Sequence, residues 1–140
     1  MIKVYLSFNG NTREALDYYV DVFNATDVYV LKFSEMPEDP DFPVTDDIKD
    51  LIAYSNFKTF AGDISLSDNM PGTISTPSES VWISVDSHDE VELRRAFDAL
   101  AADGEVIMPM EPTSFSPLYG QVRDKFGFYW MFLIPEDEMN

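Results

Sequence analysis

The chain of 140 residues contains no cysteine and only one histidine, His88. Without cysteine it forms no disulfide, has no thiolate metal ligand and cannot use a cysteine nucleophile. The absence of disulfides suits a reducing compartment. We expect the single histidine to be a solvated residue at the start of a helix, because no Ser-His-Asp arrangement can be assembled around it.

Basic residues are also scarce, with nine lysines and arginines against 26 acidic residues and a formal net charge of −17. Such a chain repels phosphate backbones and anionic lipids, so we expect no nucleic-acid and no membrane partner. No apolar run approaches the roughly 18 residues of a membrane-spanning helix or has the layout of a signal peptide. A cytoplasmic protein is expected, and the 45% hydrophobic content is enough for a folded core.

Glycine-rich turns are missing as well. The turn Asn9-Gly10-Asn11 lacks the second and third glycines of a dinucleotide-binding motif, so we expect no nucleotide-like cofactor. Residues 34–50 combine three prolines with many acidic residues and are predicted to form an exposed loop or lid. This loop also lacks the turn glycine and final glutamate of a calcium-binding loop, so we predict no metal there.

The first half of the chain has the pattern strand, helix and three strands. Alternation predicts a strand over residues 2–8, and Asn11 with Glu14 resembles a capping box that starts a helix running to about Phe23. Asn24 is expected to close the helix in the left-handed conformation. Further strands are predicted over residues 27–33, 51–57 and 62–67.

The second half repeats that order. A strand over residues 81–85 precedes a capping box at residues 87–90 and a helix that ends at Gly104. A short strand over residues 105–108 is expected to stop at Pro109. A hairpin over residues 118–134 reverses around Gly127, and we expect the turn charges Arg123, Asp124 and Lys125 to meet water; the alternative is a clamp for an anionic substrate.

The two halves lie about 75 to 80 residues apart and indicate two modules that pair into one fold. We predict a single α+β domain of two βαβββ modules, residues 1–68 and 81–134, joined by a linker at residues 69–80.

Strand parity defines a candidate binding surface. On the last strand it assigns Phe128, Trp130 and Phe132 to the core beneath the helices, and Tyr129 and Met131 to the opposite face. We predict that a small, flat, partly apolar ligand contacts the residues of this second face, which are Tyr5, Ser7, Ser65, Ser67, Trp82, Ser84, Tyr129 and Met131. The alternative is that these side chains fill the space themselves and bind nothing.

The motifs resemble the PhnB-like branch of the glyoxalase/bleomycin-resistance/dioxygenase superfamily, also called vicinal oxygen chelate and sometimes labelled demethylubiquinone methyltransferase-like. The matching stretches are residues 6–11, 14–19, 22–23, 66–68, 108–109, 118–120 and 124–127, with Trp130. The resemblance implies sheets that curl around a shared cavity, and a homodimer.

Metalloenzymes of this superfamily hold a metal with four His, Glu or Gln ligands. The corresponding positions in this chain are Lys3 or Val4, Ser65, Ser80 and Met131, none of which is a usual ligand. The resemblance therefore implies a protein without metal or cofactor that binds a small, partly apolar organic molecule between its modules. The alternatives are a divalent-metal lyase, isomerase or dioxygenase that uses the acidic loop, and an antibiotic-sequestering protein like the bleomycin-resistance members, which bind a cationic drug at a dimer groove.

Overall fold

A computed structural model of the chain describes residues 1–136 and divides it into two compact units, Met1–Thr76 and Pro77–Asn140. The division falls inside the segment predicted as a linker. The first unit contains β1 (Val4–Phe8), α1 (Thr12–Val22), β2 (Thr26–Lys32), the 3-10 helix η1 (Phe33–Glu35), β3 (Ile52–Thr59) and β4 (Gly62–Asp68). The second contains β5 (Trp82–Asp86), α2 (Glu90–Asp103), β6 (Glu105–Glu111), β7 (Tyr119–Arg123) and β8 (Tyr129–Leu133).

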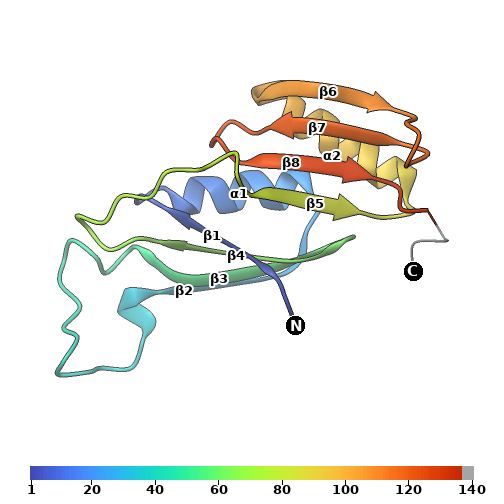
Figure 1. Ribbon diagram of the computed structural model, residues 1–140. Helices are drawn as coiled ribbons and strands as arrows, with labels where there is room; N and C mark the ends of the chain where they lie inside the picture. Colours follow the sequence, from blue (N-terminus) through green and yellow to red (C-terminus); the bar gives the residue numbers. More distant parts are fainter. Residues whose placement is uncertain (137–140) are drawn as a thin grey trace. The chain divides into compact units, whose positions relative to one another are not determined.

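Each unit folds into one mixed sheet and one long helix, labelled in Figure 1. The strand orders are β1-β4-β3-β2 and β5-β8-β7-β6, with the first and last strands of each unit parallel. The same βαβββ connection thus occurs twice, and the predicted α+β fold is confirmed. None of the helices in residues 1–136 is long and apolar enough to cross a membrane.

In the first unit α1 packs on one face of the sheet. Leu16 and Tyr19 of the helix are almost completely buried, as are Leu6 and Phe8 of β1. The rings of Phe8 and Tyr19 lie 6.5 Å apart between centroids. Burying an apolar side chain of this size contributes about 1.5–3 kcal/mol, so this packing holds the helix to the sheet and leaves the other face uncovered by α1.

In the second unit α2 covers its sheet in the same way. Leu93 and Phe97 of the helix are buried, and Trp130 and Phe132 of β8 have no exposed surface. The rings of Phe97 and Phe132 meet nearly at right angles with centroids 5.6 Å apart. Because side chains alternate along a strand, Trp130 and Phe132 point toward the helix, and the predicted core positions of both are confirmed.

The start of α1 differs from the prediction. Asn11 is the N-cap residue but makes no side-chain bond to the helix, and its Oδ1 accepts instead from the backbone N–H of Asn9 at 3.2 Å. Asp68 of β4 takes over, because its Oδ1 accepts from the N–H of Thr12 at 3.0 Å and from the Thr12 hydroxyl at 2.7 Å. The predicted capping box of Asn11 and Glu14 is therefore wrong, and the buried carboxylate of Asp68 caps the helix instead.

The cap of α2 is shifted by two residues. Asp89 accepts a hydrogen bond from the N–H of Glu92 at 3.1 Å, whereas Ser87 accepts from the N–H of Asp89. The predicted box at residues 87–90 is thus wrong in detail, and the helix begins at Glu90, two residues later than that box implies. His88 is exposed just before the cap. At its end the helix meets Gly104, as predicted.

Strand β6 does not stop at Pro109 but continues to Glu111. It is an edge strand, paired only with β7 in its sheet, and its register shifts between Met108 and Glu111. A proline has no N–H to donate, but at a shifted edge position none is needed. The proline therefore interrupts the pairing without ending the strand.

The hairpin between β7 and β8 forms as predicted, with Gly127 at a φ of +95°. The expectation that Asp124 meets water is wrong, because its exposed fraction is 3%. Its carboxylate accepts hydrogen bonds from the N–H groups of Phe126 and Phe128 at 2.9 and 3.0 Å and from the indole N–H of Trp130 at 2.8 Å. All three donors lie within six residues of Asp124. The turn therefore folds around this carboxylate, which accepts the hydrogen bonds that water would otherwise accept.

Candidate functional site

The face of the first sheet opposite α1 carries the predicted polar residues, of which Ser65 and Ser67 are buried. In the register of β1 with β4, Tyr5 pairs with Ser65 and Ser7 pairs with Ser67, and all four alternate with core residues such as Leu6. The Tyr5 hydroxyl donates to the Ser67 oxygen at 2.8 Å. The structure therefore brings these four predicted residues together on one face.

The neighbouring strand β3 adds two residues to this face that were not predicted from the sequence. Asn56 pairs with Ser65 in the register of the two strands, and the Ser65 hydroxyl donates to the Asn56 Oδ1 at 2.8 Å. The same hydroxyl lies 3.4 Å from the phenol oxygen of Tyr54. Because a hydroxyl has a single hydrogen, the shorter bond to Asn56 is the stronger one.

Lys3, which lies just before β1, completes the group. Its ammonium donates to the Tyr54 phenol oxygen at 2.8 Å and to the Asn56 Oδ1 at 3.3 Å. The amide nitrogen of Asn56 donates in turn to Asp63 at 3.2 Å. We call Lys3, Tyr54, Asn56, Asp63 and Ser65 the Tyr54 cluster.

The cluster changes the acidity of its phenol. The hydrogen bond from the Lys3 ammonium, followed by that from Ser65, lowers the pKa of Tyr54 below its ordinary value, while burial opposes the shift. A donor beside a phenol stabilises the phenolate more than the neutral form. Tyr54 is therefore suited to stabilise negative charge on a bound oxygen or to exchange a proton with it.

Two further aromatic rings flank this polar group. The rings of Tyr5 and Tyr29 lie 6.3 and 6.1 Å from that of Tyr54 between centroids. Tyr5 and Tyr29 are 50% and 52% exposed. The face thus offers flat, partly apolar surfaces around a polar centre, which is the combination that fixes small aromatic ligands.

The corresponding face of the second sheet carries the other predicted residues. In the register of β5 with β8, Trp82 pairs with Tyr129 and Ser84 pairs with Met131. The rings of Trp82 and Tyr129 lie 5.0 Å apart, and the guanidinium of Arg123 lies 5.7 Å from the Tyr129 centroid. These four residues share the face opposite the helix, and Arg123 adds a cation that the prediction left in a solvated turn.

Gln121 of β7 was also missed. It pairs with Met131, and its amide nitrogen donates to the Tyr119 hydroxyl at 2.9 Å. Ser84 donates to Asp86 of the same strand. The signal for Gln121 was available in the sequence, since a polar residue alternates with buried Gly120 and Val122.

The donor chemistry of the structure does not fit a metal. Within residues 1–136 there is no group of three or more His, Cys, Asp or Glu side chains that could hold an ion. Of the positions that correspond to ligands in metalloenzymes, Lys3 and Ser65 belong to the Tyr54 cluster and Ser80 bonds to Ser78 at 2.8 Å. An ammonium, two hydroxyls and the thioether of Met131 do not form a site for a hard or borderline cation.

Comparisons with known proteins agree with this fold. The family model described as 3-demethylubiquinone-9 3-methyltransferase matches residues 1–133. Protein YjdN of Escherichia coli is 34% identical over 141 residues, covering 93% of this chain and 92% of its own. The crystal structure of PA1353 from Pseudomonas aeruginosa has a TM-score of 0.79 at 33% identity and covers 98% of both chains.

More distant structures share the fold alone. The PhnB protein of Bacillus cereus has a TM-score of 0.61 at 23% identity, covering 95% of this chain and 98% of its own. A glyoxylase/bleomycin resistance protein/dioxygenase domain from Frankia has a TM-score of 0.60 at 14% identity, covering 98% of this chain and 92% of its own.

Proposed function

Because the chain belongs to the 3-demethylubiquinone-9 3-methyltransferase family, the PhnB-like family of the glyoxalase/bleomycin-resistance fold, we propose that it binds a small, partly apolar organic molecule without a metal. The ligand contacts the helix-free faces of the sheets. In the first unit the contacts come from Tyr5, Ser7, Ser65 and Ser67, and we add Lys3, Tyr54 and Asn56. In the second unit they come from Trp82, Ser84, Tyr129 and Met131.

The observation that carries the proposal is the Tyr54 cluster. The Lys3 ammonium and the Tyr54 hydroxyl lie 2.8 Å apart, on a face flanked by exposed tyrosine rings. A planar ring with an acidic hydroxyl or a carbonyl group complements this arrangement, because its oxygen meets two donors and its face meets aromatic surface. A hydroxylated quinone, the class of molecule in the family description, has this form.

Methyl transfer with a nucleotide-like cofactor is not part of the proposal. The turn before α1 contains only Gly10 among its residues 9–11. The N–H of Thr12 at the start of the helix is already bonded to Asp68 at 3.0 Å, so this helix end does not offer that group to a phosphate. The family description therefore supports the ligand class and not the reaction.

Calorimetric titration tests the proposal. The probes are 2-hydroxy-1,4-naphthoquinone and 1,4-naphthoquinone, which differ by the acidic hydroxyl. We expect the hydroxylated probe to bind more tightly, and Lys3→Met and Tyr54→Phe each to weaken it about tenfold, equivalent to 1.4 kcal/mol. Tyr18→Phe, the same change on α1, serves as the control and should leave binding unchanged. Absence of binding, or equal binding by all variants, would overturn the proposal.

The net charge of −17 favours a second candidate, an antibiotic-sequestering protein that holds a cationic drug. Expression in drug-sensitive cells distinguishes the two: protection against cationic glycopeptide antibiotics supports sequestration, and unchanged sensitivity removes it.

For the assembly we propose a homodimer, which sedimentation equilibrium tests through a mass twice that of one chain.

A further inference from the structure

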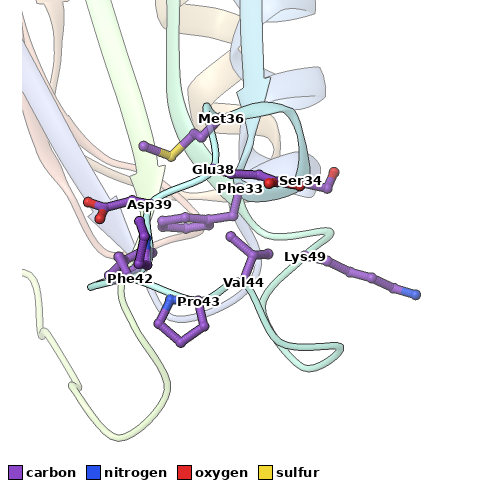
Figure 2. Close-up of a pocket in the computed structure, with 10 residues that line it drawn as sticks. Phe33, Ser34, Met36, Glu38, Asp39, Phe42, Pro43, Val44 and Lys49 are labelled. Atoms are coloured by element: carbon purple, nitrogen blue, oxygen red, sulfur yellow. The ribbon is translucent and has the colours of Figure 1, made fainter.

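A pocket of about 480 Å³ lies in the first unit, formed by η1 and the loop that follows it. It shares no residue with the Tyr54 cluster. Figure 2 shows Phe33 in the middle of the group, with Met36 above it in the view and Phe42, Pro43 and Val44 below. The other lining residues are Ser34, Glu38, Asp39, Pro40 and Lys49. The volume lies within the range of pockets that hold small organic molecules, roughly 300–1,000 Å³.

The lining is apolar at its centre, although the loop is otherwise polar. The rings of Phe33 and Phe42 lie 5.9 Å apart between centroids. Met36, Phe42 and Val44 keep 38%, 38% and 40% of their surface exposed. An exposed group of large apolar side chains that is no part of a core is typical of a binding surface.

The loop is held in shape by its own hydrogen bonds. The N–H of Ser34 donates to the carbonyl of Lys49 at 3.0 Å, and the N–H of Phe42 donates to that of Asp39 at 3.0 Å. Ile48, with an exposed fraction of 4%, fixes the far end of the loop to the unit. A ligand therefore meets a formed pocket and need not order the chain, which lowers the entropic cost of binding.

The charge around the pocket is mostly negative. Residues 34–50 contain one basic residue, Lys49, and seven acidic residues: Glu35, Glu38, Asp39, Asp41, Asp46, Asp47 and Asp50. Glu38 and Asp39 belong to the lining. Lys49 extends away from the phenylalanine rings in Figure 2, and its ammonium lies 3.7 Å from Asp46. The local potential is therefore negative, and the aromatic faces of Phe33 and Phe42 also attract cations.

We propose that this pocket binds a small organic cation with an apolar body, such as an aryl-alkyl ammonium. The apolar part contacts Phe33, Phe42 and Val44, and the positive charge lies near Glu38 and Asp39. The site is separate from the proposed sheet-face site in residues and in ligand charge, so either can fail without the other. A second copy of the chain is a poor occupant, because two loops of the same negative charge repel each other.

The test uses two probes with the same ring and opposite charge, 4-phenylbutyltrimethylammonium and 5-phenylpentanoate. Titrations followed by calorimetry and by amide chemical shifts give the affinity and the location. We expect the cation to bind with shifts in residues 33–49 and the anion not to bind. Equal binding of both probes, or shifts confined to other residues, would overturn the proposal.

Variants separate the two contributions. Phe42→Ala should weaken binding of the cation at least tenfold, equivalent to 1.4 kcal/mol, by removing an aromatic wall. Glu38→Gln with Asp39→Asn should weaken it about threefold to tenfold through the lost charge. The control pair Asp47→Asn with Asp50→Asn makes the same charge change outside the lining and should have a smaller effect.

Unchanged affinity in both pocket variants, or an equal effect of the control pair, contradicts the site. Amide spectra that match the parent outside residues 33–49 show that Phe42→Ala has folded. Sedimentation of Phe42→Ala tests the other possible occupant, a second copy of the chain. A lower mass than that of the parent would mean that the pocket is a contact between copies, and this would overturn the proposal.

Discussion

The ammonium of Lys3 lies 2.8 Å from the phenol oxygen of Tyr54, although the two residues are 51 positions apart in the chain. The contact exists because β4 lies between β1 and β3 in the sheet, so that the residue before β1 reaches across to β3. Both side chains also meet Asn56 or Ser65 of the same face. This pair makes the face chemically distinct from an ordinary solvent-exposed sheet.

The first prediction concerns the acidity of that phenol. Removing the ammonium with Lys3→Met takes away the main cause of the lowered pKa of Tyr54, so the pKa should move back toward the ordinary value of about 10. Phenolate absorbance near 295 nm, taken as the difference between each protein and its Tyr54→Phe variant, isolates this one tyrosine. The same titration curve with and without Lys3 would contradict the assignment.

The same shift predicts how stability depends on pH. The folded protein releases the Tyr54 proton at a lower pH than the unfolded chain, because the pKa is lowered in the fold. The contribution of Tyr54 to stability is therefore fully present above about pH 10 and is lost as the pH falls through the folded pKa. Urea unfolding should show the stability difference between the parent and Tyr54→Phe shifting in favour of the parent as the pH rises toward 10. A difference that does not change with pH would contradict it.

The next prediction concerns Asp124. In Asp124→Asn the Oδ1 still accepts from the turn, but an amide N–H₂ faces the indole N–H of Trp130, where the carboxylate accepted a bond at 2.8 Å. An unsatisfied buried donor of this kind costs about 1–3 kcal/mol. Urea unfolding followed by circular dichroism measures the loss. Lys125→Gln in the same turn is the control, since Lys125 is exposed.

A double-mutant cycle tests the cause. In a Trp130→Phe background there is no indole N–H to leave unpaired, so Asp124→Asn should cost about 1 kcal/mol less than in the parent. Additive effects of the two substitutions would mean that the bond between the indole and the carboxylate does not carry the cost.

Gly104 and Gly120 allow a matched comparison of steric cost. A Cβ on Gly104 would lie 2.2 Å from the backbone oxygen of Arg123, which cannot move without disturbing β7. A Cβ on Gly120 would lie 2.6 Å from the sulfur of Met110, in a flexible side chain, and 3.0 Å from Cε2 of the buried Phe97 ring. We expect Gly104→Ala to cost about 2–3 kcal/mol and Gly120→Ala about 1 kcal/mol. The reverse order of melting temperatures would contradict the packing described for the end of α2.

Local patterns in the sequence were sufficient for the elements and for half of the site. Alternation assigned Ser65 and Ser67 to the face opposite the helix and Trp130 to the core, because strand parity depends only on neighbours in the chain. It could not predict the contact between Lys3 and Tyr54, because this contact depends on the order of strands in the sheet. It also missed Asp68 and Asp124, whose carboxylates are surrounded by backbone donors from distant or tightly turned segments. The sequence pattern alone does not distinguish such a buried, hydrogen-bonded carboxylate from one that is exposed to solvent.

The last prediction concerns Pro109 in the edge strand β6. The strand keeps Val106, Ile107 and Met108 at 45%, 40% and 42% exposure. An exposed apolar edge can pair with another chain, and a proline blocks this because it donates no hydrogen bond and fixes the backbone. Pro109→Thr should therefore leave the melting temperature nearly unchanged but increase self-association, which light scattering over a concentration series measures. Pro112→Thr, just beyond the strand, is the control. If both variants scatter like the parent, Pro109 does not protect the edge.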